Sequence, residues 1–357
     1  MGFNRIQTKQ LTAVLIGITF VVIMLGGIVR VYDAGESCPD WPTCFGSFGF
    51  DVSEADQEAW WDANPDEIDS RGSLHRYTSF EIFTEWFHRL IAGSILGPLV
   101  LLNWWLARKE EGLTTEVRLA SSISVGLIIW QGLLGWLTVK MDNEHWSVAL
   151  HLASALMFMM SLIWMWLAIA RDLREEPDWI TFDPILAHSW HKRITWLSLA
   201  TLLTLFTGVF VATTPGANQA CGVGGFPNTW PLCNGELFSK ITDIYAQSQL
   251  IHRLLVGIVG LALIAASIII WRESDDGQCG SLLSKWIYLT SGMFLLNLSL
   301  GGLYVLSAKV DGFEIVYDEL LSLFHLMFAS ITFLLLATIW TSMKVISFYE
   351  SNPESIE

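Results

Sequence analysis

The residues best suited to chemistry lie between Phe83 and Leu90, at the head of a long apolar run. Glu85 and His88 are three residues apart, so a helix would place their side chains on one face. Ionisable groups are unfavourable at the edge of a membrane span, which suggests a functional site. A carboxylate there can act as an acid or a base, or can stabilise positive charge. The alternative is an ordinary interfacial acid held in a hydrogen bond.

Four of the eight histidines stand at equivalent places, each near the start of an even-numbered apolar run. They are His88, His151, His252 and His325. Two histidines that face each other across a four-helix bundle can ligate one haem iron axially. The alternatives are polar residues hydrogen-bonded at helix ends, or a zinc or copper site, for which the sequence offers no dense ligand cluster of the usual spacing.

Arginines and glycines near these histidines fit the haem interpretation. Guanidinium groups can pair with haem propionates, although they can also snorkel to the membrane interface. Glycines on neighbouring helices would let a flat macrocycle approach the backbone. The candidate arginines are Arg30, Arg89 and Arg253, and the candidate glycines are Gly132, Gly135, Gly301 and Gly302.

The composition places these residues in a membrane. The chain has 357 residues, of which 52% are hydrophobic and 18 are Trp, and this is too apolar for a soluble domain. The formal net charge is −15 with the acids clustered between Val31 and Phe80, which argues against nucleic acid as a partner. Eight runs approach the roughly 20 residues that a bilayer requires. They cover 11–30, 82–106, 117–139, 147–170, 191–212, 248–271, 285–307 and 320–346.

The basic residues that flank these runs predict the orientation of the chain. They fall on one side of the runs, which the positive-inside rule assigns to the cytoplasm. We therefore expect both termini in the cytoplasm. The segments expected outside are 31–81, 140–146, 213–247 and 308–319.

The two halves of the chain repeat. Trp41-Pro42-Thr43-Cys44 returns as Trp230-Pro231-Leu232-Cys233 after 189 residues, and Gly27 is matched with Gly208 after 181. The repeat predicts an all-α integral membrane protein whose eight transmembrane helices form two pseudo-symmetric four-helix bundles. We expect the N-terminal bundle in residues 1–175 and the C-terminal bundle in residues 176–357.

Two differences break the repeat. Glu85 precedes its histidine by three residues, whereas the equivalent place in the second half holds Gln249. The first bundle is therefore expected to do chemistry, and the second to hold a permanent cofactor. The first outer loop also carries about 25 more residues than the second, including Trp60 and Trp61. We interpret these residues as a variable lid or a solvated excursion and assign no chemistry to them.

The cysteines form two outer pairs and one single residue. Cys38 lies near Cys44, and Cys221 lies near Cys233, while Cys279 is alone in a cytoplasmic loop, where an inert thiol is expected. An oxidising outer compartment predicts a disulfide in each pair. Each disulfide can be a structural staple for a loop that covers a site, or a thiol pair that exchanges electrons, and the sequence leaves both interpretations open.

With these motifs in order on eight runs, residues 11–345 resemble the heme A synthase family, of the bacterial type with cysteine pairs in its outer loops. The resemblance rests on Gly26-Gly27-Ile28-Val29-Arg30, Cys38-Pro39-Asp40-Trp41-Pro42-Thr43-Cys44-Phe45-Gly46, Glu85-Trp86-Phe87-His88-Arg89, Gln131-Gly132-Leu133-Leu134-Gly135-Trp136-Leu137-Thr138-Val139, His151-Leu152, His252-Arg253 and His325. The long acidic segment at about 47–80 departs from the short first loop that the family leads us to expect.

The resemblance implies an oxidoreductase of the bacterial cytoplasmic membrane that oxidises the C8 methyl group of haem O to a formyl group. Two successive hydroxylations would give a gem-diol that loses water, which leaves haem A for cytochrome c oxidase. The resemblance places haem b on His252 and His325, haem O near His88 and His151, and the catalytic role on Glu85. It further implies membrane lipid, a haem O synthase and an electron carrier as partners, and leaves a homo-oligomer open.

Two other classes of protein stay as alternatives. A membrane di-haem electron-transfer cytochrome would also use four histidines, but these all lie near the outer side, whereas a transmembrane electron wire needs haems toward both faces. A haem chaperone or exporter would bind haem without changing it. Glu85 discriminates between the classes, because neither alternative needs an acid there.

Overall fold

The chain folds into membrane-length helices. The structure is a computed structural model that describes residues 5–67, 71–72, 74–214, 217–223, 225–237, 243–275, 281–307 and 315–347. Eight helices in this part of the chain are long and apolar enough to cross a membrane. Each predicted run lies inside one of them, so the predicted all-α membrane class is confirmed. The spans, numbered one to eight below, are Gln7–Val31, Ser79–Lys109, Thr115–Lys140, His145–Leu173, Pro184–Thr213, Ile244–Glu273, Leu282–Ser307 and Asp318–Ile346.

Span two differs from the others in its local geometry, because a π-helical turn joins two α-helices. Spans one to four are called the first half of the chain below, and spans five to eight the second half. The helices are α1 (Arg5–Val31), α2 (Glu54–Ala63), α3 (Ser79–Arg89), the π-helix η1 (Leu90–Leu96), α4 (Gly97–Lys109), α5 (Thr115–Lys140), α6 (His145–Leu173), α7 (Pro184–Thr213), the short 3₁₀ turn η2 (Ala217–Gln219), α8 (Ile244–Asp275), α9 (Leu282–Ser307), α10 (Ile315–Ser342) and the π turn η3 (Met343–Ser347).

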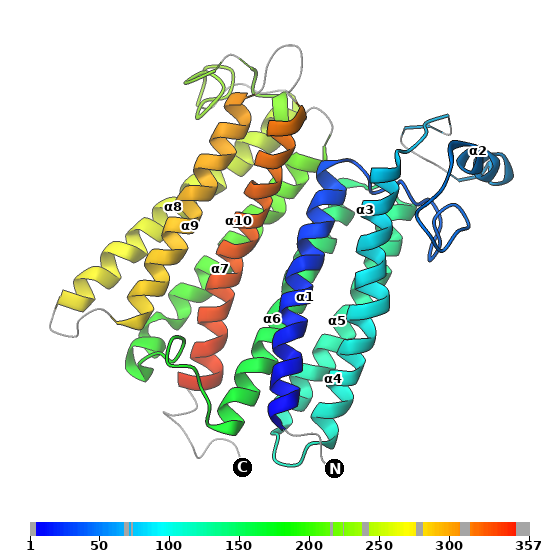
Figure 1. Cartoon of the computed structure of the whole chain (residues 1–357). Coiled ribbons are helices and arrows are strands. Elements are labelled where there is room, and N and C mark those ends of the chain that lie inside the picture. The colour runs from blue at the N-terminus through cyan, green and yellow to red at the C-terminus, as the bar shows by residue number, and fades with distance from the viewer. Residues whose placement is uncertain are drawn as a thin grey trace.

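The two ends of the helices differ in character. Figure 1 shows that α1 begins and α10 ends at one end, while the described parts of both cysteine-containing loops lie at the other. At the end where α1 begins, Arg108 Cζ lies 4.1 Å from the ring centre of Trp104, and Lys109 Nζ lies 4.3 Å from that of Trp105. Such cation–π pairs suit a membrane interface, where aromatic rings and basic groups gather.

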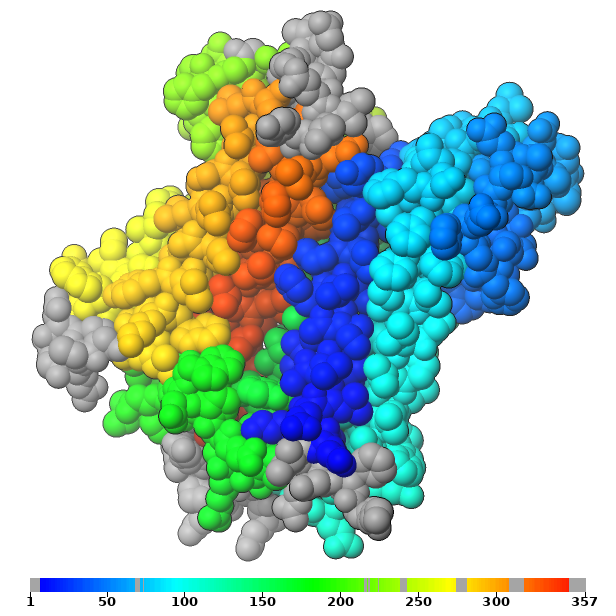
Figure 2. Space-filling model, viewed as in Figure 1, coloured from blue at the N-terminus to red at the C-terminus, as the bar shows by residue number. Residues whose placement is uncertain are grey.

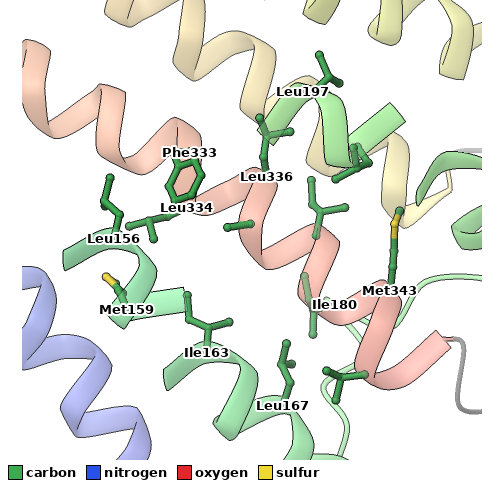
Figure 3. Packing of buried hydrophobic residues seen from close by; sticks show 14 of the residues in the cluster. Leu156, Met159, Ile163, Leu167, Ile180, Leu197, Phe333, Leu334, Leu336 and Met343 are labelled. Carbon is green, nitrogen blue, oxygen red and sulfur yellow. The ribbon is translucent and has the colours of Figure 1, made fainter. Parts of the chain in front are cut away.

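An apolar core joins the two halves. The most apolar window of α6 is 56% buried, against 17–33% for the other spans, so α6 is the central helix. It packs against α1, α5, α7 and α10. Figure 3 shows the core around it, where Leu156 of α6 lies beside Phe333 and Leu334 of α10. Because this contact is apolar and buried, it fixes the positions of the neighbouring helices that carry the candidate site.

The acidic loop between spans one and two folds into a small lobe. Its helix α2 begins after Ser53 with a capping box, in which the Ser53 side chain accepts from the Asp56 N–H and the Asp56 carboxylate accepts from the Ser53 N–H. Gln57 ties the lobe to the chain before span two. Its side chain donates to the Tyr77 carbonyl at 3.0 Å and accepts from the Tyr77 N–H at 2.9 Å. Two hydrogen bonds between Gln57 and Tyr77 therefore hold the lobe against the chain that precedes span two.

This lobe covers the first cysteine pair. Cys38 and Cys44 are 0% and 1% exposed, and they form one cluster with Trp61 and Tyr77, which are also buried. In Figure 2 the lobe projects sideways beside the outer end of span two. The extra residues thus cover the first disulfide, while most side chains of α2 remain exposed. Cys279 and residues 308–314 of the last outer loop lie outside the described part of the chain.

Candidate functional site

Both predicted disulfides are present. Cys38 is bonded to Cys44, and Cys221 to Cys233, with a Cα–Cα distance of 4.4 Å in each pair. The two loops also share a backbone pattern, because Cys44 pairs with Ser47 just as Cys233 pairs with Glu236 in an isolated antiparallel bridge. The repeat that the sequence predicts at an offset of 189 is therefore present in the loop geometry.

One large cavity contains the predicted site residues. It has a volume of about 1280 Å³ and is lined by side chains from both halves of the chain. Among the lining residues are Glu85, His88, His151, His252, His325, Arg30, Arg89 and Arg253. The four histidines and the three arginines that the sequence singled out thus face a common space, although they come from five different helices.

The cavity brings the histidines together in pairs. His88 is close enough to His151 for their charged forms to repel each other, and His252 stands in the same relation to His325. Each half therefore presents two imidazoles toward one space. Among the described residues there is no group of three or more His, Cys, Asp and Glu side chains that could hold a bare metal ion. The arrangement suits an iron that brings four equatorial ligands of its own.

A glycine of the preceding span lies against each of the four histidine rings. A Cβ atom added at Gly26 would lie 3.2 Å from His88 Cε1, and one at Gly208 would lie 2.8 Å from His252 Cε1. Gly208 is thus equivalent to Gly26 at an offset of 182. The match of Gly27 with Gly208 from the sequence was wrong by one residue, and Gly27 faces leucines of span eight instead.

The same relation holds for the second histidine of each half. A Cβ atom at Gly135 would lie 3.4 Å from His151 Cε1, and one at Gly301 would lie 2.7 Å from His325 Cε1. These glycines give the imidazole rings room close to the helix backbone. Of the other two candidate glycines, Gly302 faces the Trp230 ring, and Gly132 has no atom within 4 Å of an added Cβ.

The imidazoles of the second half are fixed by hydrogen bonds. Nδ1 of His325 lies 3.0 Å from the Asn297 carbonyl oxygen, to which it can donate. Nδ1 of His252 lies 3.1 Å from the Thr207 hydroxyl. A hydrogen bond at Nδ1 holds the ring and leaves Nε2 as the nitrogen available to a metal. These two rings are therefore held in place through their Nδ1 atoms.

The imidazoles of the first half are held less firmly. Nδ1 of His151 is buried and makes no hydrogen bond with any described residue. Nδ1 of His88 is likewise buried and makes no hydrogen bond with the described residues. The two halves thus share the positions of their histidines but differ in how tightly the rings are oriented.

Glu85 connects the first histidine to the first disulfide loop. It is 3% exposed, and its Oε2 accepts from the Cys38 N–H at 2.7 Å and from the Ser37 hydroxyl at 3.0 Å. Its Oε1 pairs with Arg89 at 2.5 Å. Because hydrogen bonds and an ion pair satisfy the carboxylate, it can stay charged at the wall of the cavity. A fixed negative charge there can stabilise positive charge that develops on a bound molecule.

Arg89 holds the same loop through its backbone. Its guanidinium donates to the carbonyl oxygens of Cys38 and Asp40, both at 2.7 Å, and to that of Thr43 at 3.3 Å. Arg89 therefore braces the disulfide loop over the cavity as well as pairing with Glu85. These contacts come from residues distant in sequence, so nothing in the local sequence pattern indicated them.

The second half has the equivalent arginine contacts, with an amide side chain in place of the carboxylate. Arg253 donates to the carbonyl oxygens of Thr229 and Leu232, and to Gln249 Oε1 at 2.5 Å. The Gln249 side chain in turn donates to the Ala217 carbonyl. The same scaffold thus carries a carboxylate in the first half and an amide in the second.

Arg30 stands between the two halves. Its guanidinium pairs with Asp33 at 3.2 Å and donates to the Ala212 carbonyl of α7 at 2.8 Å. Its Nε is buried and makes no hydrogen bond with the described residues. Arg30 therefore reaches across from span one to span five while it lines the cavity.

The sequence did not indicate the roles of several residues that contact the site. Ser37 donates to Glu85, Thr207 contacts His252, and Gly26 and Gly208 make room for imidazoles. Only the glycines had a usable signal, because each stands at a repeat-equivalent place in an odd-numbered span. Ser37 and Thr207 are ordinary residues whose roles depend on tertiary contacts.

Comparisons with known proteins agree with one another. A family model described as cytochrome oxidase assembly protein matches residues 9–337. Heme A synthase of Shouchella clausii is 26% identical over 324 residues, which cover 88% of this chain and 90% of that protein. Heme A synthase of Rhodospirillum centenum is 28% identical over 282 residues, covering 72% and 70%. Heme A synthase of Flavobacterium psychrophilum is 27% identical over 311 residues, covering 78% and 86%.

Proposed function

Because the chain belongs to the cytochrome oxidase assembly protein family, we propose that it acts as a heme A synthase, an oxidoreductase that converts haem O into haem A for cytochrome c oxidase. The observation that carries the proposal is the buried carboxylate of Glu85 beside the first histidine pair, opposite an amide at Gln249 in the second half. An enzyme needs such a difference between two similar sites, whereas a symmetric carrier of two haems does not.

The second histidine pair is the proposed site of a resident haem b. His252 and His325 fit this role, because their Nδ1 atoms have hydrogen-bond partners and glycines leave room for their rings. Haem iron bound there would supply one-electron redox chemistry. Arg253 lines the same part of the cavity and is the proposed partner for a propionate.

The first histidine pair is the proposed site of the substrate haem O. His88 and His151 face the same cavity but their rings are held less firmly, which suits a molecule that must leave after reaction. Arg30 and Arg89 line the cavity nearby and are the proposed partners for the substrate propionates. The division into two four-helix bundles, in residues 1–175 and 176–357, belongs to this proposal.

Oxidation of a methyl group to a formyl group removes four electrons and adds one oxygen atom. We assign this to two successive hydroxylations of the C8 methyl group, each of which takes an oxygen atom from water and releases two electrons and two protons, after which the gem-diol loses one water. Glu85 would stabilise positive charge that develops at the methyl carbon, because its carboxylate is fixed at the cavity wall by Ser37, Cys38 and Arg89. An electron carrier must accept the electrons.

The proposal includes a place in the cell. The chain is a multi-pass membrane protein, and we assign it to the bacterial cytoplasmic membrane with both termini in the cytoplasm and both disulfide loops outside. The position of both loops at the end opposite the start of α1 supports this orientation (Figure 1). Membrane lipid, a haem O synthase and an electron carrier are the expected partners, and a homo-oligomer stays open.

The direct test is production of the modified haem. The chain is expressed in a bacterial host that makes haem O but lacks its own enzyme for haem A, and the extracted haems are identified by mass spectrometry and pyridine haemochrome spectra. Haem A is expected only when the chain is present. If haem O stays unmodified although the protein is inserted normally in the membrane, the enzyme assignment is wrong. That result would favour the di-haem electron-transfer cytochrome.

A further inference from the structure

We propose that the substrate haem enters and leaves the first-half site sideways from the bilayer, through an opening between spans two and three at Gly97 and Gly132. The inference rests on the proposed function, since it takes the first half as the site of an exchangeable haem. It goes beyond that function by naming the route and the residues that keep it open.

The cavity reaches the outer surface of the helices along this seam. Leu101 of span two and Ile129 and Trp136 of span three all line it, yet they are 50%, 58% and 46% exposed. A side chain that borders a cavity and is half exposed stands at the mouth of that cavity. The mouth is apolar, so it suits the apolar edge of a porphyrin that arrives from the lipid.

The glycines leave this seam free of side chains. A Cβ atom added at Gly132 would meet no atom within 4 Å, and one added at Gly97 would meet only the backbone oxygen of Ala92 at 3.7 Å. Both glycines line the cavity. No side chain of the described chain therefore packs across the opening at these two places.

Span two is shifted by one residue relative to span six. The π-helical turn η1 adds one residue after His88, and α8 has no such turn in the described residues. The buried positions Leu96, Val100 and Asn103 accordingly match Val259, Leu263 and Ala266 at an offset of 163, one less than the offset between His88 and His252. Gly97 is therefore equivalent to Gly260.

Ile258 and Leu261 of span six also line the cavity and are 63% and 70% exposed, but the place equivalent to Gly97 is closed in the second half. The ring of Phe294 in span seven packs against Gly260, where an added Cβ would lie 3.0 Å from Phe294 Cε1. Span three holds the smaller Ile128 at the place of Phe294, and Gly132 at the place of Leu298. Where the half proposed to retain its haem has Phe294 and Leu298, the half proposed to exchange its haem thus has the smaller Ile128 and Gly132. This difference points to exchange as the purpose of the opening.

The test exchanges these residues and follows haem binding rather than catalysis. Purified protein in detergent is mixed with iron protoporphyrin IX, and loading and release of the first-half haem are followed by absorbance, with the resident haem as an internal reference. Gly132→Leu combined with Ile128→Phe is expected to slow both processes about tenfold or more. Gly126→Leu is the matched control, because Gly126 lies on the same helix, does not line the cavity, and has no atom within 4 Å of an added Cβ.

The reciprocal variant keeps the test informative if the first one does not fold. Phe294→Ile combined with Leu298→Gly is expected to release the resident haem about tenfold faster than wild type. Wild-type exchange rates in the folded Gly132→Leu and Ile128→Phe protein, or unchanged retention in the reciprocal variant, would overturn the proposal. If exchange changes as expected but no haem A forms in the host assay, the opening stands and the proposed reaction fails.

Discussion

The backbone N–H of Cys38 donates a hydrogen bond to Glu85 Oε2 at 2.7 Å, so the first disulfide loop and the proposed catalytic carboxylate form one unit. Arg89 closes the unit, because it pairs with Glu85 Oε1 and donates to the Cys38 carbonyl. A change in the loop must therefore reach the carboxylate. The disulfide role that the sequence left open thus acquires a structural component, which is to hold Glu85 in place.

Replacing Cys38 and Cys44 together by serine should weaken this unit. A disulfide that closes so short a loop stabilises the fold by about 2 kcal/mol, and its loss should lower the free energy of unfolding by that amount. Haem A formation per folded protein should fall about tenfold or more, because Glu85 loses a fixed partner. Thermal denaturation and haem extraction measure the two effects.

The second disulfide supplies the matched control. Cys221→Ser with Cys233→Ser should cost about 3 kcal/mol of stability, since the closed loop is longer. It leaves the contacts of Glu85 untouched, so haem A formation per folded protein should stay near wild type. An equal loss of activity in both double variants would contradict the special role of the first loop.

The glycines that face the histidines predict a graded series. Gly301→Ala and Gly208→Ala place a Cβ at 2.7 and 2.8 Å from the imidazole carbons, so the rings must move. Gly135→Ala, whose Cβ lies 3.4 Å from His151 of the first half, should leave the resident haem of the second half in place. Loss of ligand orientation commonly lowers metal affinity about 10–100-fold, and the resident haem should weaken on that scale in the first two variants.

Absorbance of the purified variants measures this series through the content and spin state of the bound haem. Gly17→Ala serves as control, because the space beside Gly17 is open and alanine favours a helix. Equal haem content in Gly301→Ala and Gly135→Ala would contradict the predicted order.

The ligand assignment predicts that the two histidine pairs behave differently. His252→Ala or His325→Ala should deplete the tightly bound haem, because each removes a side chain proposed to hold the haem iron. His88→Ala and His151→Ala should leave that haem in place and lower binding of added haem to the first half. A normal spectrum in the His252 and His325 variants would count against the assignment.

The lobe over the first disulfide predicts slow access of reductants. Trp61 is 5% exposed and packs in the cluster that buries Cys38 and Cys44. Trp61→Ala should speed reduction of this disulfide by a small thiol about tenfold or more, because exchange depends on access to the sulfur atoms. The rate is read by alkylation of the freed cysteines. Leu74→Ala, in the same lobe but at a residue that is 90% exposed, should not change the rate.

Much of the frame could be predicted because it depends on local composition. Span lengths follow from the thickness of a bilayer, and the four histidines stood out because the halves repeat. The disulfides joined cysteines within one loop, so their pairing was also within reach. Each of these features needs only the order of residues along the chain.

The details of the site depend on contacts that the sequence does not display. Gly26 faces His88, whereas the sequence repeat had indicated Gly27. A one-residue error in matching the two halves turns a helix position by about 100° around the helix axis. The extra residue of η1 likewise shifts the register of span two by one residue, so that Gly97 is equivalent to Gly260 of span six. Arg89 binds backbone carbonyls about 50 residues away, and no periodicity indicates such partners.

The proposed oxidation of haem O depends most on Glu85, and Glu85→Gln tests this role directly. The scaffold already accepts an amide in this position, because Gln249 pairs with Arg253 in the second half. The variant should therefore fold and retain its resident haem b, while the ratio of haem A to haem O in the host membranes falls about 100-fold or more. Mass spectrometry of extracted haems, with haem b as the internal standard, measures this ratio. A wild-type ratio in Glu85→Gln would contradict the account.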